Sequence, residues 1–124
     1  MKIKTSELKD AALDWAVAYA LNGSAAFFDV FGARMLGRSI TAEVLAGAIK
    51  PSTDWGQAGP LIDKFDVAVF RVADGECGAE IGHCYLQNEG LNIDQIGESR
   101  LIAACRAIVA AKLGDTVDVP EELV

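Results

Sequence analysis

The sequence has few of the residues on which common catalytic and metal sites depend. It contains one histidine, three cysteines and three prolines among its 124 residues. Its twelve glycines form neither the GxGxxG nor the GxxxxGKS/T pattern of phosphate-binding loops, and HExxH is absent. These absences exclude the nucleotide-binding and zinc-protease classes that those motifs define. The carboxylates are numerous but scattered, which is typical of a solvated surface.

The one place where an imidazole and a thiol are neighbours is His83 and Cys84, with Cys77 preceding them across a predicted turn. Such groups can form a nucleophile and its base, or zinc ligands together with Cys105. On a strand, however, adjacent side chains point to opposite faces, so this pair cannot hydrogen-bond or share a metal without a bulge. Cys105 falls on an apolar helical stripe and is expected in the core. We therefore predict no catalytic residue, metal or cofactor.

Basic residues are also in short supply, because 11 Lys and Arg face 18 Asp and Glu, for a net charge of −7. This balance argues against a protein that binds nucleic acid through the phosphate backbone. Much of the acidic excess lies at the end of the chain. We expect a single globular domain at 1–114 and a solvated acidic C-terminal tail at 115–124. The alternative is that Val117, Asp118 and Val119 form a strand that docks on the sheet or on a basic partner.

No apolar run approaches the roughly 20 residues of a membrane-spanning helix, so no membrane association is expected. The N-terminal segment has early lysines, but Glu7, Asp10 and Asp14 interrupt its apolar residues, unlike a signal peptide. An odd number of cysteines in a chain of this size fits a reducing compartment. These features predict a soluble cytoplasmic protein.

What the sequence does have is a recognisable order of helix and strand patterns. The last helix pattern is the strongest, because Ser99 can cap it and Gly114 can end it. The order indicates an α+β fold in which a small antiparallel sheet is covered on one face by an N-terminal and a C-terminal helix. The expected elements are a strand at 1–4, a helix at 7–21 capped by Ser6, extended pieces between 25 and 37, a short helix at 40–50 with Thr41 as its cap, a helical turn at 60–65 that starts with Pro60, a hairpin of 66–73 with 79–87, and a helix at 100–113.

The segment PSTDWGQAGPLI at 51–62 has the most unusual local chemistry and is the best candidate site. In a structural interpretation, Asp54 accepts hydrogen bonds from nearby amides, Trp55 buries its ring, and the glycines supply unusual backbone angles. In a binding interpretation, the segment presents an aromatic ring and polar groups to a partner. The structural interpretation is the simpler one, and both stay open. The candidate binding residues are Asp54, Trp55, Gln57, Gly59 and Pro60.

Three blocks, KIKTSELKDAALDWAVAYA, PSTDWGQAGPLID and SRLIAACRAIVAAKLGDTVDVPEEL, together resemble the NinX-like family of phage and prophage proteins. The resemblance covers about half of the chain, and residues 24–50 inherit nothing from it. It implies a bacterial or bacteriophage setting but no activity, because the family has no established biochemical function. It also marks Asp14 and Trp15 of the first helix as family-like residues, which we expect to be structural.

These observations favour a small accessory protein that works as a non-enzymatic interaction module. Its partner is expected to be a host or phage protein, bound through the STDWGQAGP segment; the sequence predicts no oligomeric state. A second hypothesis is a small-molecule enzyme or ligand-binding protein with Asp54 and Trp55 in a pocket. A third is a decoy for nucleic-acid-binding proteins, based on the acidic residues, although the charge outside 115–124 is modest.

Overall fold

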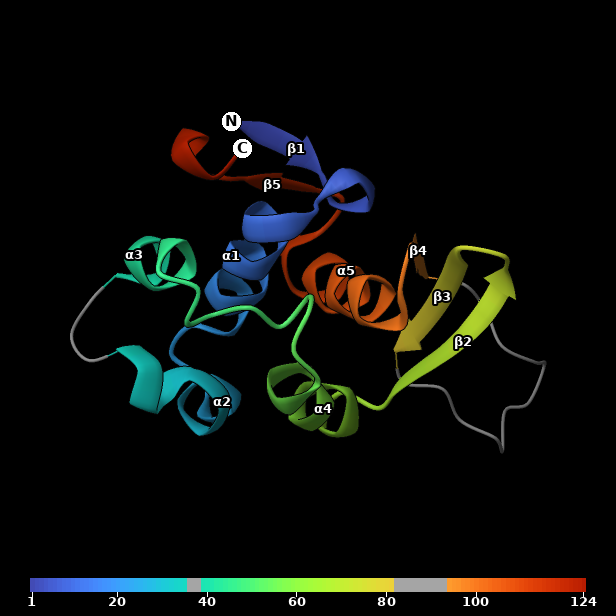
Figure 1. Cartoon of the computed structure of the whole chain (residues 1–124), viewed down its shortest axis with the longest axis horizontal. Helices are drawn as coiled ribbons and strands as arrows, with labels where there is room; N and C mark the ends of the chain where they lie inside the picture. The colour runs from blue at the N-terminus through green and yellow to red at the C-terminus, as the bar shows by residue number, and fades with distance from the viewer. Residues whose placement is uncertain (36–38, 82–93) are drawn as a thin grey trace.

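Figure 1 shows the computed structural model of the protein, which describes residues 1–35, 39–81 and 94–124. Within these ranges the chain forms helices and two small antiparallel sheets, so the expected α+β class is confirmed. The elements in chain order are β1 (Lys2–Lys4), the 3-10 turn η1 (Thr5–Glu7), α1 (Asp10–Leu21), α2 (Ala25–Met35), α3 (Ile40–Leu45), α4 (Trp55–Lys64), β2 (Val67–Ala73), β3 (Glu76–Ile81), β4 (Gln95–Gly97), α5 (Arg100–Leu113), β5 (Thr116–Asp118) and the 3-10 turn η2 (Glu121–Leu123).

The larger sheet has the strand order β2–β3–β4, with both pairs antiparallel. The hairpin of β2 and β3 closes at Gly75, whose φ of +71° favours glycine. This confirms the expected hairpin within the described residues, although its second strand starts at Glu76, earlier than predicted; the expected strand residues 82–87 lie outside the described ranges. Strand β4 lies between the expected hairpin and the expected last helix, where the sequence predicted no helix or strand. It was missed because three residues within a polar stretch carry no alternating pattern.

Helix α5 is the centre of the molecule. It packs on the β2–β3–β4 sheet, and α1 packs against α5 from the side away from that sheet (Figure 1). The C-terminal helix therefore covers the sheet directly, while the N-terminal helix covers the C-terminal helix. Helices α2 and α3 contact α1, and α4 contacts both α2 and α5. This arrangement places the start of α4 near the start of α5 and the larger sheet.

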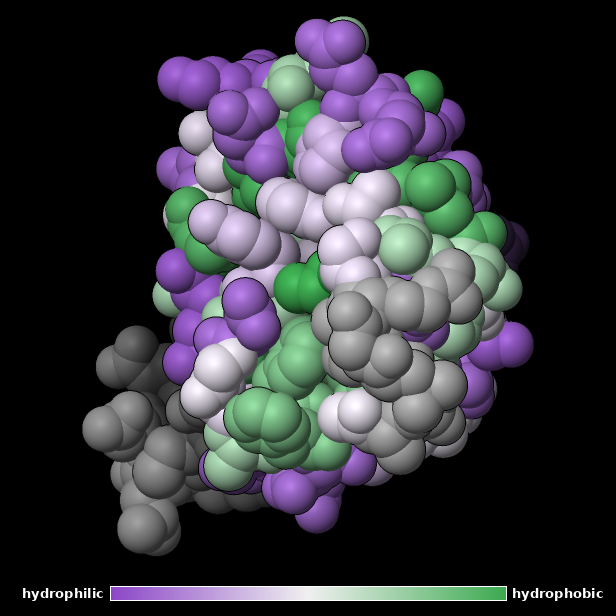
Figure 2. Space-filling model, turned by 90° about the vertical axis from the view of Figure 1, so that its left-hand side faces the viewer, coloured by the Kyte–Doolittle hydropathy of each residue, from purple (hydrophilic) through white to green (hydrophobic). Residues whose placement is uncertain are grey.

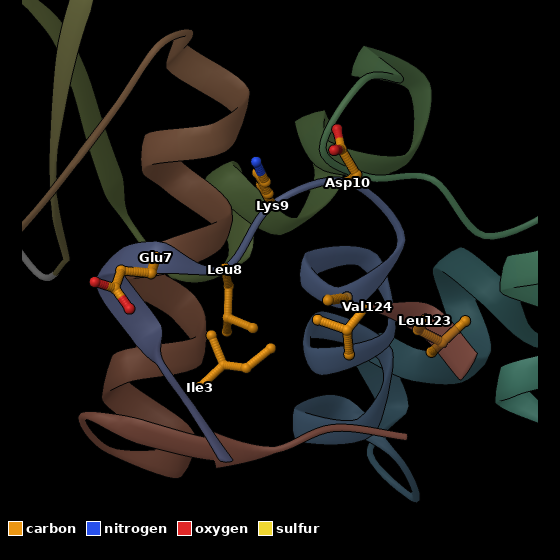
Figure 3. Close-up of a pocket in the computed structure, with 8 residues that line it drawn as sticks. Ile3, Glu7, Leu8, Lys9, Asp10, Leu123 and Val124 are labelled. Atoms are coloured by element: carbon orange, nitrogen blue, oxygen red, sulfur yellow. The ribbon is translucent and has the colours of Figure 1, made fainter. Parts of the chain in front are cut away.

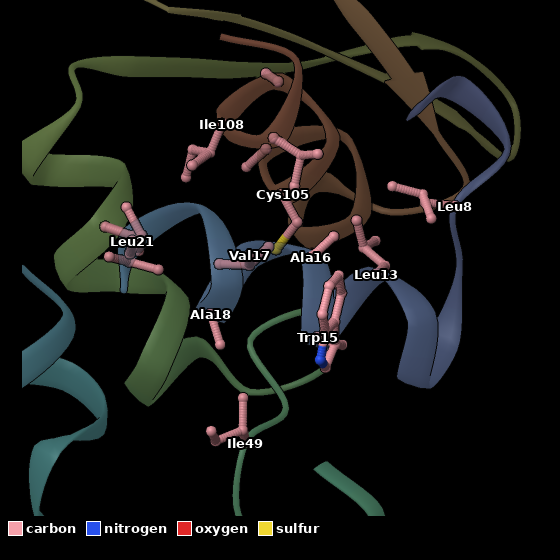
Figure 4. Close-up of a cluster of buried hydrophobic side chains, with 14 of the residues drawn as sticks. Leu8, Leu13, Trp15, Ala16, Val17, Ala18, Leu21, Ile49, Cys105 and Ile108 are labelled. Carbon is pink, nitrogen blue, oxygen red and sulfur yellow. The ribbon is translucent and has the colours of Figure 1, made fainter. Parts of the chain in front are cut away.

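The core between α1 and α5 is built largely from small side chains. Ala16 of α1 and Ala103 of α5 have no exposed surface, and Ala104 is 1% exposed. Figure 4 shows Cys105 pointing from α5 toward Ala16 and Val17 of α1. Small residues on both helices let the two backbones approach closely. Burial raises the pKa of the Cys105 thiol, and the nearby Asp14 carboxylate raises it further, so this thiol is a core residue as expected.

Helix α2 corrects the expectation of extended pieces between 25 and 37 for residues 25–35, whereas residues 36 and 37 lie outside the described ranges. The aromatic and β-branched residues of this segment favoured strands, and Gly32 was interpreted as a break. In the structure Phe27 and Phe31 lie one helical turn apart, are buried, and contact each other edge to face with ring centroids 5.6 Å apart. Ser24 stabilises the first turn by accepting the Phe27 N–H at 3.2 Å. Tertiary burial of one helical face therefore outweighs local strand preference.

Two helix starts differ from the expected ones. Helix α1 begins at Asp10 rather than Glu7, since η1 occupies the segment that Ser6 was expected to cap. No side chain caps α1, and Asp10 adopts a positive φ of 52°, a conformation that aspartate tolerates better than most residues. Helix α3 is capped by Ser39, not Thr41, through a 3.1 Å hydrogen bond from the Ala42 N–H to Oγ. It ends at Leu45, so only the first half of the expected helix at 40–50 forms.

The expectation of a solvated tail at 115–124 is wrong for the apolar residues of that segment. Strand β5 pairs antiparallel with β1, in register Ile3↔Val117, and this is the alternative strand interpretation. Val117, Val119 and Leu123 are buried, whereas the acidic residues between them are exposed. Alternation of apolar and charged residues is the normal pattern of a strand with one buried face, and here it outweighs the local charge.

Arg106 joins α5 to two other parts of the fold. Its Nε donates to the Leu8 carbonyl at 2.8 Å, just before α1, and its Nη1 donates to the Ile96 carbonyl of β4 at 2.7 Å. Burial lowers the pKa of this guanidinium and Glu98 raises it. The arginine thus connects two short segments that have little core of their own.

We expect Arg106→Ala to lower the free energy of unfolding by about 2 kcal/mol, because two charge-assisted hydrogen bonds are lost and two carbonyls lose their partner. Urea denaturation of the purified chain measures this change. Arg106→Lys should recover only part of it, since one ammonium cannot reproduce the planar fork. Arg100→Ala, at an exposed arginine of the same helix, is the matched control and should change little. Equal effects at both positions would contradict the proposed connection.

Candidate functional site

The segment at 51–62 is mainly the start of a helix, not a loop. Asp54 is the N-cap of α4: its Oδ1 accepts the Gly56 N–H at 2.8 Å, and its carbonyl accepts the Ala58 N–H at 3.0 Å. The expectation that a helical turn starts with Pro60 is therefore wrong, since Pro60 lies inside α4. The missed signal is the spacing of Asp54 and Gln57, which matches a helix-capping pattern. The preference of proline for a first helical position was given too much weight.

Gln57, which was expected to be a binding group, is an interior residue. It is 1% exposed, its Nε2 donates to the Ala48 carbonyl at 2.9 Å, and its Oε1 accepts the Lys50 N–H at 2.8 Å. Both ends of its amide are therefore used to hold the chain between α3 and α4. The Gln57 amide thus provides hydrogen-bond partners for backbone groups that lie outside helices and strands.

Asp14 holds the same segment from the other side. It is 6% exposed, and its Oδ1 accepts the Ser52 N–H at 2.8 Å. Burial raises the pKa of Asp14 to about 6, the hydrogen bond from the Ser52 N–H opposes this rise, and the charge of Asp10 adds to it. Trp15 is 9% exposed, and its ring stacks on Tyr19 at 4.7 Å between centroids. Asp14 and Trp15 thus occupy structural positions.

These contacts fix the backbone that leads into Trp55, whose side chain is 55% exposed. The ring lies beside a groove with a volume of about 450 Å³. The groove is bordered by the start of α4, the β2–β3 hairpin and the start of α5, and we call it the Trp55 groove. Its lining residues are Ser52, Thr53, Trp55, Arg71, Cys77, Glu98, Ser99, Arg100, Leu101 and Ile102.

The Trp55 groove combines apolar and charged groups. Cys77 and Leu101 are buried, whereas Arg71, Glu98 and Arg100 are exposed. Neither arginine forms an ion pair or a side-chain hydrogen bond with any residue that the structure describes. Within the part of the chain that the structure describes, the groove therefore offers two unpaired guanidinium groups beside a half-exposed indole ring. Sequence analysis missed both arginines because they are distant in the chain from Trp55 and carry no motif.

The other candidate residues do not line the Trp55 groove. Asp54 directs an oxygen to the Gly56 N–H, and Pro60 is exposed on α4. Gly59 lies in the same helix, where a Cβ would meet no heavy atom within 4 Å beyond its neighbours. Of the five candidate binding residues, the structure thus places only Trp55 in this groove.

A second hollow of about 290 Å³ lies at the opposite end of the fold, where η1 meets the C-terminal segment. Figure 3 shows Ile3 and Leu8 pointing toward one another across it, while Glu7 and Lys9 direct their charged ends outward. Its surface is largely apolar, and no set of polar groups converges on it. Such a hollow offers little to orient a ligand.

Exposed apolar side chains also occur away from both hollows. Figure 2 shows the face on which α2 and α3 lie, with hydrophilic residues gathered near the chain termini and hydrophobic surface over its middle and lower part. Phe28 of α2 is 66% exposed and Leu45 of α3 is 60% exposed. Single exposed apolar residues are common on proteins and define no site alone.

The structure tests only some of the expectations about cysteine, histidine and membrane-spanning segments. Cys77 and Cys105 are buried free thiols, whereas His83 and Cys84 lie outside the described residues. Among the described residues, no three side chains of the metal-binding types gather closely enough to hold an ion. Nor does any helix in the described ranges combine the length and hydropathy needed to cross a bilayer.

Comparison with known proteins places the chain in a family. A search of curated proteins finds no match. A family model described as Bacteriophage P22, NinX matches residues 4–112. The matched range includes Asp14, the α4 start with its cap, and all residues that line the Trp55 groove. It also includes residues 24–50, which the sequence resemblance had left out. Because the match spans most of the sequence, the chain belongs to this family of bacteriophage proteins, and the resemblance seen in the sequence is confirmed.

Proposed function

We propose that this phage protein is a non-enzymatic interaction module that binds a host or phage protein at the Trp55 groove, in the cytoplasm of the bacterial host. The observation that carries the proposal is the position of Trp55. A tryptophan that is 55% exposed stands at the first position of a helix, beside a groove, and is not part of the hydrophobic core of the described residues. Tryptophan and arginine are the residues most often found at the energetic centre of protein interfaces.

The support beneath Trp55 adds to this proposal. Asp54 caps the helix, Gln57 holds the chain at 48–50, and Asp14 holds Ser52. The backbone that carries the indole is therefore fixed before any partner arrives. Preorganisation of this kind lowers the entropy lost on binding.

The small-molecule alternative has less support. An acid or base must reach the bound molecule, but Asp54 is not among the residues that line the groove, and its Oδ1 accepts a backbone N–H. The hydrogen bond to Gly56 is the normal role of an aspartate N-cap. A half-exposed tryptophan beside charged residues fits a protein interface better than an enclosed pocket.

We expect Trp55→Ala to weaken partner binding by about 2 kcal/mol or more, roughly 30-fold, without changing thermal stability. The immobilised full chain would be exposed to lysate of phage-infected bacteria, and retained proteins compared by quantitative mass spectrometry. Phe28→Ala, which removes a somewhat more exposed aromatic ring from α2, is the matched control and should retain the partner.

Two results would contradict the proposal. If Trp55→Ala retained the same proteins as the wild type, the groove would not be the binding site. If the variant unfolded at a clearly lower temperature, Trp55 would be a structural residue, as the simpler interpretation of the sequence holds.

A further inference from the structure

We infer that the segment bound at the Trp55 groove is an acidic peptide: it places a carboxylate side chain against Arg71 and Arg100 and an apolar side chain against Trp55. This inference rests on the proposed function and specifies its partner. It is carried by the two guanidinium groups, unpaired among the described residues, that border the same groove as the exposed indole.

The charges of the groove favour a carboxylate. Two arginines and one acidic residue, Glu98, line it, so its local charge is positive. Arg71 and Arg100 are exposed and unpaired with any described residue, which leaves their N–H groups available. The planar fork of a guanidinium matches the two oxygens of a carboxylate, so an Asp or Glu side chain satisfies these donors well.

The apolar part of the groove favours a neighbouring hydrophobic side chain. Trp55 forms one wall, and the buried Cys77 and Leu101 contribute to its lining. An apolar residue beside the acidic one would cover the indole and remove water from the arginine–carboxylate contact. Contacts at the rim that exclude water from the centre are the arrangement that makes such central contacts strong.

The overall charge argues for a short acidic peptide over a nucleic acid. The chain carries a net charge of −7, so a polyanion would be repelled by the protein as a whole. A peptide with one or two carboxylates interacts mainly with the charges of the groove itself, because charges more than about 10 Å away are screened by physiological salt.

The test is an NMR titration of the full chain with two pools of short synthetic peptides. One pool carries Asp or Glu at its central positions with all other positions randomised, and the matched pool carries Asn or Gln there. The readouts are the indole N–H of Trp55 and the Nε–H groups of Arg71 and Arg100. A single-stranded oligothymidine is titrated in parallel as the nucleic-acid probe.

We expect the acidic pool to shift all three signals and the amide pool to bind about tenfold more weakly, with the difference shrinking as salt is added. Arg71→Gln/Arg100→Gln should remove the preference for the acidic pool. Lys4→Gln/Lys64→Gln removes the same charge from exposed lysines that do not line the groove and should keep it. If the arginine variant unfolds, the salt dependence in the wild type decides.

Three results would overturn the inference. They are equal binding of both peptide pools, no shift of these signals with the acidic pool, and a stronger response to oligothymidine than to the acidic pool. Failure of the acidic-peptide inference can be distinguished from failure of the proposed function. A partner that is lost by Trp55→Ala but held equally well by Arg71→Gln/Arg100→Gln would support the groove as the binding site and refute the acidic partner.

Discussion

Replacing Gly97 by alanine should destabilise the fold by about 3 kcal/mol, because the new methyl group has no space. Gly97 is the last residue of β4 and is buried against the start of α5. A Cβ built there would lie 2.7 Å from the Ala103 nitrogen and 2.7 Å from the Ile102 Cγ2. One of these neighbours is backbone within a helix, so it cannot rotate away. Strand and helix would have to separate.

Separating β4 from α5 would also change the shape of the Trp55 groove. Gly97 pairs with Cys77 across the sheet, and both Cys77 and Ile102 line the groove. We therefore expect Gly97→Ala to impair partner binding in addition to lowering the unfolding midpoint in urea. Hydrogen–deuterium exchange should show the loss first in β4 and the first turn of α5.

Gly32→Ala is the matched control for this substitution. Gly32 lies in α2, and its added Cβ would meet only the Phe28 side chain, at an ordinary contact distance of 3.5 Å. Because alanine favours a helix over glycine, we expect this variant to be unchanged or more stable by up to about 1 kcal/mol. If Gly97→Ala were tolerated as well as Gly32→Ala, the close contact between β4 and α5 would be refuted.

Gly97 also shows what could not be predicted from the sequence. The limits of α5 were predicted because Ser99 and Gly114 mark them locally, and the structure confirms both: the Ser99 Oγ accepts the Ile102 N–H, and Gly114 has a φ of +88°. The need for glycine at position 97 arises from packing against a separate element. No local pattern records such a contact.

The candidate site, too, has features that the local sequence marks and features that arise only when separate elements pack together. The unusual chemistry of 51–62 identified the segment, because Asp54 and Trp55 are informative residue types near glycine and proline. The two arginines that give the groove its charge come from β2 and α5, and only the fold brings them beside Trp55. The roles of Gln57 and Asp14 were hidden for the same reason, since the backbone partner of Gln57 lies 7 residues away and that of Asp14 lies 38 residues away.

Asp14 should make stability depend on pH in a direction opposite to that of a salt-bridged carboxylate. Its pKa is raised from 3.8 to about 6 in the fold, mainly by burial. The folded state therefore holds a proton that the unfolded chain releases, so stability falls as pH rises from about 4 to about 6. A shift of this size corresponds to roughly 3 kcal/mol between the two limits.

The substitution that tests this is Asp14→Asn, which keeps an oxygen to accept the Ser52 N–H and removes the titration. Urea unfolding at a series of pH values gives the stability difference between the variant and the wild type. We expect the wild type to gain roughly 3 kcal/mol relative to the variant as pH falls from about 7 to about 4. Other carboxylates titrate in both proteins and cancel in the comparison.

Asp10→Asn is the control with the same change of charge one turn earlier in α1. Asp10 is exposed and has a φ of 52°, which asparagine also tolerates. This variant should keep the pH-dependent gain, with its midpoint slightly lowered because Asp10 helps to raise the pKa of Asp14. Since Asp14 holds Ser52 at the edge of the Trp55 groove, partner binding should follow the same pH range. A stability difference between Asp14→Asn and the wild type that stays constant with pH would show that Asp14 titrates as in the unfolded chain.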